Sequence, residues 1–233
     1  HESTITGTVV DDQGQPLAGA YIKATNPDHP EESFETTTGP DGKYALAVTF
    51  TSYLWESLQK FNIDLFKPGH TAQQTIVETV ADRTAGAGKK FLKRLDSVVT
   101  RITRAGGTHI NEKGDVQIIV PAGALQQAAD FRTTLYDHSQ ELPGPLPLTS
   151  QFTYAGDFDN EEVPLSEPAT VKIANSLGFA PQTEIPIGYY NPETRQWDDS
   201  GVKAVVDDLG EWLVYEADHF SWPDCNLPAL PPP

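Results

Sequence analysis

Short runs of alternating apolar and polar residues, separated by turn-forming residues, constrain the fold of this chain more than any other feature. The first run, residues 3–10, alternates and is rich in β-branched side chains, a pattern typical of a β-strand. The turn clusters at residues 11–16 and 39–42 contain Gly, Pro and Asp, which adopt turn conformations readily. Repetition of this pattern predicts an all-β protein.

The strands expected from this pattern fall into two groups. In the first half of the chain they are residues 3–10, 17–24, 34–38, 43–48, 61–66 and 75–80, the last two forming a hairpin around the turn 67–70. In the second half they are residues 116–125, 132–136, 148–154, 169–174, 185–190 and 212–215. Residues 52–58 are interpreted as a short helix. The spacing predicts two β-sandwich domains in tandem.

Residues 84–104 differ from both halves. The breaker cluster 85–88 precedes apolar residues at helical spacing, and six of the 16 basic residues of the chain lie here. We interpret the segment as a short basic connector that pairs with the acidic half of the chain. The connector is expected to be helical, or a strand over residues 98–103. The alternative is a basic amphipathic helix on a membrane surface. The predicted organisation is a sandwich at 1–83, the connector at 84–104, a second sandwich at 105–226 and a Pro-rich linker at 227–233.

The net charge of −17 is concentrated in the second half of the chain. Residues 1–110 carry 11 basic and 13 acidic side chains, whereas residues 111–233 carry 5 basic and 20 acidic ones. Such a field repels nucleic acid and anionic lipid, so we expect no nucleic-acid partner. No apolar run reaches about 18 residues, which argues against membrane insertion. The single cysteine, Cys225, excludes an intrachain disulfide.

The first half resembles the carboxypeptidase regulatory-like (transthyretin-like) β-sandwich. The residues that carry the resemblance are Ile5, Thr6, Gly7, Val9, Gly14, Pro16, Leu17, Gly19, Ala20, Thr37, Asp41, Gly42 and Tyr44. The resemblance implies an accessory module of exported proteins and no catalytic role. Together with the absent initiator Met and the Pro-rich end, it leads us to expect a fragment of a larger exported bacterial protein, extracellular or on the cell surface.

The second half is similar to the domain type shared by ankyrins, netrin receptors and zonula-occludens proteins. The residues that carry this similarity are Gly106, Gly107, the segment 116–125, Tyr189, Tyr190, Trp197 and the closing tripeptide His219, Phe220 and Ser221. Large bacterial surface proteins that begin with the same accessory module end in a similar way. Relatives of this type cut their own backbone between Phe and Ser, which implies Ser221 as nucleophile and His219 as base.

The tripeptide has a physical basis for this chemistry. In an extended strand, side chains at positions i and i+2 share a face, so His219 and Ser221 can meet while a buried Phe220 anchors the backbone between them. The hydroxyl would attack the adjacent carbonyl in an N-to-O acyl shift, and no substrate has to be recruited. Asp218 alternates to the opposite face of such a strand, so it is not expected to orient the imidazole.

Two functions from different classes stay open. One is a self-processing module that cuts between Phe220 and Ser221 and stays associated with the downstream part of its own polypeptide, with no activity on external substrates. The other is a non-catalytic surface spacer or adhesion module, whose partner would be another surface protein or a glycan. Denaturing mass analysis separates the two.

No cofactor is expected from the sequence. The acidic segment 157–162 is the one candidate for Ca²⁺, because Asp157, Asp159, Glu161 and Glu162 supply hard oxygen ligands. It lacks the spacing of an EF-hand, and we favour a solvated acidic loop. No pair of histidines has the spacing of metal ligands.

Overall fold

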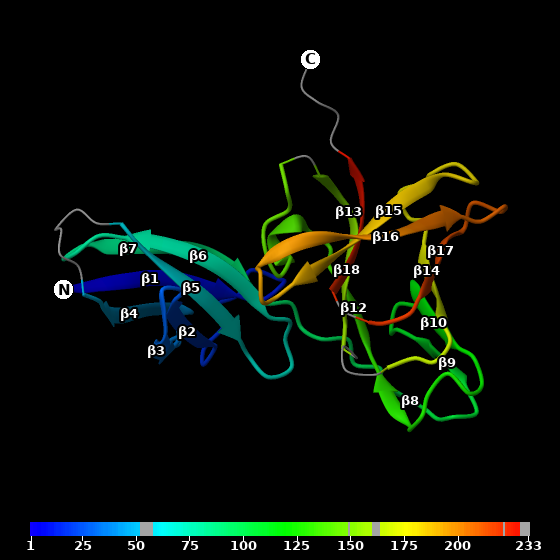
Figure 1. Cartoon of the computed structure of the whole chain (residues 1–233), viewed down its shortest axis with the longest axis horizontal. Helices are drawn as coiled ribbons and strands as arrows, with labels where there is room; N and C mark the ends of the chain where they lie inside the picture. The colour runs from blue at the N-terminus through cyan, green and yellow to red at the C-terminus, as the bar shows by residue number, and fades with distance from the viewer. Residues whose placement is uncertain (52–57, 149, 160–163, 221, 229–233) are drawn as a thin grey trace, which may run out of the picture. The chain divides into compact units, whose positions relative to one another are not determined.

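The chain folds into two compact units, both built of β-strands (Figure 1). The computed structural model describes residues 1–51, 58–148, 150–159, 164–220 and 222–228, the last range by its backbone. Unit 1 comprises residues 1–94 and 140–145, and unit 2 comprises residues 95–139 and 146–233. The predicted fold class, tandem all-β sandwiches, is confirmed. The helix expected at residues 52–58 lies, except for Leu58, outside the described residues.

Unit 1 is a sandwich of two sheets. One sheet has the order β4-β1-β7 and the other the order β3-β2-β5-β6. Its strands are β1 (Glu2–Val10), β2 (Tyr21–Asn26), β3 (His29–Thr37), β4 (Lys43–Thr49), β5 (Gln59–Phe66), β6 (Gln73–Thr79) and β7 (Thr84–Phe91). The expected hairpin is present as the antiparallel pair β5–β6.

The core of unit 1 follows from strict alternation along its strands. In β4, Tyr44, Leu46 and Val48 are buried while the residues between them are exposed. They pack with Ile22 and Ile63 of the facing sheet. Apolar burial of this kind is the main driving force for such a fold.

Residues 84–104 differ from the predicted helical connector. Residues 84–91 form β7, which pairs in parallel with β1 and completes the three-stranded sheet. The cluster 85–88 is therefore not a break between domains, because Ala87 is buried in the core of unit 1. The strand alternative is correct further on, where β8 (Thr100–Ile102) forms in unit 2. The apolar residues at helical spacing lie mostly beyond β7, and residues 92–99 form no helix.

Residues 140–145 belong to unit 1 although they lie far along the chain. The side-chain amide of Gln73 donates to the carbonyls of Gln140 and Leu142, at 2.6 and 2.8 Å. The ammonium of Lys93 lies 3.5 Å from the carboxylate of Glu141, and both side chains are buried. The sequence contains no pattern that predicts this return of the chain.

Unit 2 is built around one long sheet with the order β12-β13-β18-β15-β16-β17-β14-β10-β9. Besides β8, its strands are β9 (Gly107–Ile110), β10 (Val116–Val120), β11 (Ala129–Phe131), β12 (Thr133–Leu135), β13 (Ser150–Phe158), β14 (Ala169–Ala174), β15 (Glu184–Asn191), β16 (Gln196–Val206), β17 (Trp212–Ala217) and β18 (Trp222–Pro228). A single turn of 3₁₀ helix, η1 (Ser139–Glu141), lies between β12 and β13, and its residues 140 and 141 belong to unit 1.

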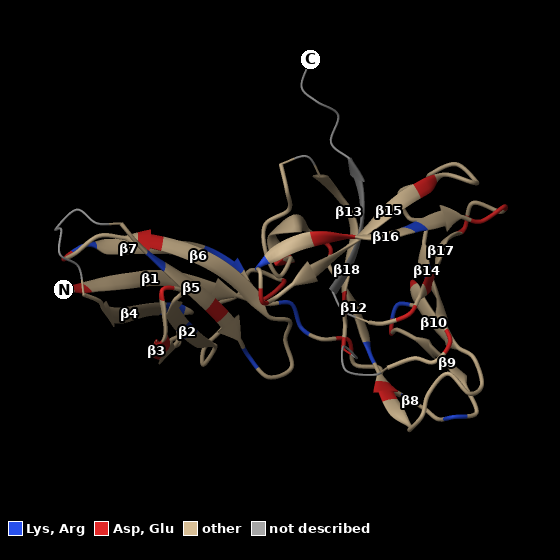
Figure 2. Cartoon of the chain, in the orientation of Figure 1, with Lys and Arg blue, Asp and Glu red and all other residues tan. Residues whose placement is uncertain are grey.

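Strands from both ends of this sheet supply side chains to one core. Ile118 of β10 and Val171 of β14 belong to the same buried cluster as Tyr154 and Phe158 of β13. The long strand β16 joins the two halves, because it pairs with β15 along most of its length and with β17 at Val205 and Val206. Acidic residues outnumber basic ones on this unit, as Figure 2 shows.

The end of the chain differs from the predicted linker at 227–233. Leu227 and Pro228 belong to β18 and pair with Gln151 and Ser150 of β13. Proline is tolerated at a strand end because a missing donor there costs little. Residues 229–233 lie outside the described residues.

Candidate functional site

His219 and Phe220 lie in the connection between β17 and β18, two strands that β15 and β16 separate in the sheet. Strand β17 ends at Ala217, Asp218 and His219 form a bend, and β18 begins at Trp222. The prediction that the tripeptide continues an extended strand is therefore wrong for His219. Ser221, the expected nucleophile, lies outside the described residues. Strand β18 is hydrogen-bonded on both sides, to β13 and to β15.

Phe220 is the anchor of this connection. Its side chain is 3% exposed and belongs to the core of unit 2. The ring of Phe131 meets it edge to face with centroids 5.6 Å apart, and the ring of Phe158 lies parallel to it at 6.4 Å. Aromatic pairs in these arrangements add to the stabilisation that burial provides. The backbone at Phe220 is thus held in place by two strands, β11 and β13.

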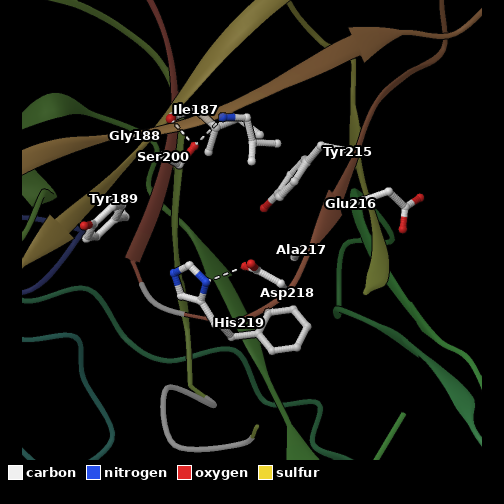
Figure 3. Close-up of a pocket in the computed structure, with 11 residues that line it drawn as sticks. Ile187, Gly188, Tyr189, Ser200, Tyr215, Glu216, Ala217, Asp218 and His219 are labelled. Carbon is white, nitrogen blue, oxygen red and sulfur yellow. Dashed lines mark hydrogen bonds and ion pairs between the residues drawn. The ribbon is translucent and has the colours of Figure 1, made fainter. Parts of the chain in front are cut away.

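His219 is held at the surface by two neighbours (Figure 3). Its Nδ1 lies 2.6 Å from Oδ1 of Asp218, and its ring meets that of Tyr189 edge to face at 6.0 Å. The hydrogen bond with His219 lowers the pKa of Asp218 below its usual value. The expectation that the side chains of Asp218 and His219 point to opposite faces is wrong, because the bend removes the strict alternation of a strand.

A pocket of about 40 Å³ lies beside these residues. Strands β15, β16 and β17 line it with Ile187, Ser200, Tyr215 and Glu216, and His219 and Phe220 also line it. The hydroxyl of Ser200 donates to the carbonyl of Ile187 at 2.5 Å. Space of this size accommodates water molecules but no sizeable ligand. The arrangement therefore fits proton transfer at the surface better than capture of a foreign substrate.

Sequence reasoning missed Tyr189, Asp218 and the pocket. Tyr189 carries part of the resemblance in the sequence, but its place beside His219 depends on the pairing of β15 with β18. The only local signal for Asp218 was its position next to a histidine, which does not distinguish a strand from a bend. Long-range strand pairing cannot be deduced from one sequence.

The acidic candidate for Ca²⁺ is only partly described. Asp157 lies in β13, and Asp159 forms an ion pair with Arg132. Glu161 and Glu162 lie outside the described residues. Among the residues with described placement, no group of three or more His, Cys, Asp or Glu side chains could hold a metal ion. Because the guanidinium of Arg132 already neutralises Asp159, this segment attracts Ca²⁺ less strongly.

The first part of the chain matches a known family. Residues 4–56 match the carboxypeptidase regulatory-like domain. None of the curated proteins compared with the chain matches it. In the described part of the chain, no helix has the length and apolar character needed to span a bilayer.

Solved structures resemble the chain only distantly. The 3-chlorocatechol 1,2-dioxygenase from Rhodococcus opacus 1CP is 11% identical with a TM-score of 0.32, over 41% of this chain and 60% of that one. The Bacillus anthracis TIE protein is 12% identical with a TM-score of 0.31, over 97% of this chain and 48% of its own. BcpA, the major pilin subunit of Bacillus cereus, is 10% identical with a TM-score of 0.27, over 100% of this chain and 60% of its own. Similarities at this level carry no functional argument.

Proposed function

We propose that this chain is a self-processing module of a larger exported protein and that it cuts its own backbone between Phe220 and Ser221. The observation that carries the proposal is the held geometry on the N-terminal side of that bond. Phe220 is clamped between Phe131 and Phe158, and the adjacent His219 is fixed by Asp218 at 2.6 Å. A fixed base next to a fixed carbonyl is what an intramolecular acyl shift requires.

The proposed reaction has two steps. The hydroxyl oxygen of Ser221 attacks the carbonyl carbon of Phe220 while His219 takes the hydroxyl proton. The carbon–nitrogen bond then breaks, His219 returns the proton to the leaving nitrogen, and an ester joins Phe220 to the side chain of Ser221. Water hydrolyses this ester, which leaves a carboxylate on Phe220 and restores the hydroxyl of Ser221. No cofactor or external substrate takes part.

The products would stay associated after cleavage. The strand that follows the bond, β18, pairs with β13 and β15, so the hydrogen bonds of two ladders remain when the chain is cut. The partner of residues 1–220 would then be the downstream part of the same polypeptide. Release would require unfolding or mechanical force on that strand.

Denaturing mass spectrometry of the purified chain tests the proposal. We expect a fragment ending at Phe220, a peptide beginning at Ser221, and an elution as one particle under native conditions. Ser221→Ala should give the intact mass, and His219→Ala should slow cleavage by about 10²-fold or more, the usual contribution of a general base. An intact wild-type chain after long incubation at pH 8 would refute self-cleavage.

A second candidate is a non-catalytic spacer or adhesion module at the cell surface. The match of residues 4–56 to an accessory family and the tandem sandwiches favour it. In that case Phe220 would serve only as a core residue and His219 as a surface side chain. An intact mass together with unchanged stability of His219→Ala would support this function.

A further inference from the structure

The bend after β17 brings two neighbouring polar side chains together. Consecutive residues of an extended strand point to opposite faces, which would separate the side chains of Asp218 and His219. Both residues lie instead in a bend, and Oδ1 of Asp218 is 2.6 Å from Nδ1 of His219. Figure 3 shows the carboxylate and the imidazole facing each other beside the pocket.

This contact determines which nitrogen of the neutral imidazole carries the proton. An ionised carboxylate can only accept a hydrogen bond, so Nδ1 must be the donor. The hydrogen bond lowers the pKa of Asp218, which keeps its carboxylate ionised. The other nitrogen, Nε2, is then unprotonated and basic. Neutral histidine in water prefers the opposite tautomer, so the contact changes the chemistry of the ring.

Among the carboxylates near the pocket, Asp218 is the one that contacts the imidazole of His219. Glu216 also lines the pocket, but its carboxylate accepts a hydrogen bond from Thr170 at 2.9 Å. The ring of Tyr189 packs edge to face against His219 at an interplanar angle of 87° and limits its rotation. One carboxylate and one aromatic ring together therefore fix both the tautomer and the orientation of the imidazole.

We infer that Asp218 is the positioning residue of the self-cleavage site, which holds His219 with Nε2 free to accept the hydroxyl proton. The inference rests on the proposed function for its catalytic meaning, whereas the tautomer can be measured without cleavage. Because 81% of the Asp218 side chain and 56% of the His219 side chain are exposed, water weakens the contact. We expect a loss of about tenfold in rate without it, well below the ~10⁴-fold loss in a buried triad.

The first experiment measures the tautomer by ¹⁵N NMR of the imidazole at pH 8 in the non-cleaving Ser221→Ala chain. Loss of the signal in an added His219→Gln substitution identifies the resonance among the 6 histidines. We expect Nδ1 to be protonated, and Asp218→Ala to move the ring toward the Nε2-protonated form. Identical ¹⁵N shifts with and without Asp218 would overturn the inference.

The second experiment measures the cleavage rate after cell-free synthesis, with the fraction cut at each time read by denaturing mass spectrometry. Asp218→Ala should slow cleavage about tenfold, and Asp218→Glu should recover part of the rate because it restores the acceptor. The control is Asp208→Ala, which removes another exposed carboxylate that accepts a hydrogen bond, from Gln182 at 2.5 Å. It should cleave at the wild-type rate.

The outcomes separate the two proposals. A wild-type chain that never cleaves refutes the proposed function, while the NMR experiment still decides whether Asp218 sets the tautomer. A wild-type chain that cleaves, with Asp218→Ala as fast as wild type, refutes the positioning role and leaves self-cleavage standing. Equal slowing by Asp208→Ala would also refute it, since the effect would then be one of overall charge.

Discussion

The hydroxyl of Tyr44 is buried in the core of unit 1 without a hydrogen-bond partner among the described residues. The side chain is 5% exposed, and burial raises its pKa to about 12. It lies across Gly7 of β1, where an added Cβ would come within 2.6 Å of the ring. The ring fills space that a glycine leaves free, and the hydroxyl is desolvated without compensation.

Tyr44→Phe should therefore stabilise the protein. The substitution keeps the ring and removes an unsatisfied polar atom, which is worth about 1 kcal/mol in the free energy of unfolding. Calorimetric unfolding at pH 7 measures it. The matched control is Tyr21→Phe, because the hydroxyl of Tyr21 has Glu35 as a hydrogen-bond partner and its removal should not stabilise. A lower melting temperature for Tyr44→Phe would show that the hydroxyl has a partner.

The aromatic clamp around Phe220 provides a second test at the scale of single residues. Phe131→Ala should destabilise unit 2 by about 3–5 kcal/mol, as for other buried aromatic side chains. It should also slow cleavage, since Phe220 loses its edge-to-face neighbour. The conservative Phe131→Leu separates the effects, because it restores most of the volume. If the Phe131→Ala variant cleaves at the wild-type rate at a temperature where it remains folded, the aromatic clamp does not contribute to cleavage.

At the scale of elements, one histidine joins three strands of unit 2. His109 of β9 is 0% exposed, with Nδ1 2.9 Å from the hydroxyl of Thr100 in β8 and Nε2 3.1 Å from that of Thr133 in β12. A neutral ring donates one of these hydrogen bonds and accepts the other. Desolvation lowers the pKa of His109 below 6.5, and Asp96 partly offsets the shift.

Unit 2 should therefore lose stability in acid. The folded pKa lies below the unfolded value near 6.5, so the unfolded chain binds more protons between the two values. Stability then falls as the pH drops below about 6.5, by at most ~1.4 kcal/mol per pH unit from this one group. Three of the four tryptophans, Trp197, Trp212 and Trp222, lie in unit 2, so fluorescence-detected urea unfolding at pH 7.5 and 5.5 reports mainly on it.

The control for this acid effect is a variant without the titrating ring. His109→Gln keeps polar atoms for the two threonines and should show a smaller difference between the two pH values, although it is less stable at both. Carboxylates contribute to acid sensitivity in both proteins and cancel in the comparison. An equal pH dependence in the two proteins would contradict a role for His109.

At the scale of the whole molecule, unit 1 is completed by a segment that lies about 50 residues beyond its last strand (residues 140–145 against β7, which ends at Phe91). The buried pair Lys93–Glu141 and the amide of Gln73 hold it. Glu141→Gln leaves a buried ammonium with less compensation, and we expect a loss of about 3–5 kcal/mol in the stability of unit 1.

Two further variants make this test specific. Glu78→Gln removes the carboxylate of the exposed pair Lys60–Glu78 in the same unit and should change stability by less than about 1 kcal/mol. Replacing both partners, with Lys93→Met and Glu141→Leu, should recover much of the loss, because an apolar pair of similar volume carries no buried charge. Equal effects of Glu141→Gln and Glu78→Gln would show that the buried pair contributes little.

The alternation of apolar and polar residues and the turn-forming residues in the sequence were sufficient to predict the class of fold and many of its strands. The hairpin of β5 and β6 and the alternating β4 were predictable because their side chains repeat every two residues and their turns are local. These features depend on interactions between residues close in the chain. The burial of Phe220 agrees with the sequence-based prediction, although that prediction assumed an extended strand where the structure has a bend.

Only the tertiary structure decided the remaining features. Residues 84–91 form a parallel strand, and Glu141 docks against Lys93, because each has a partner that is distant in the sequence. The contact between Asp218 and His219 depends instead on a bend that breaks the local alternation. Parallel pairing and buried ion pairs bring together groups whose separation along the chain has no local signature. The sequence by itself thus determined the class of fold and many of the strands, because these depend on local alternation, and packing decided which side chains His219 and Phe220 meet.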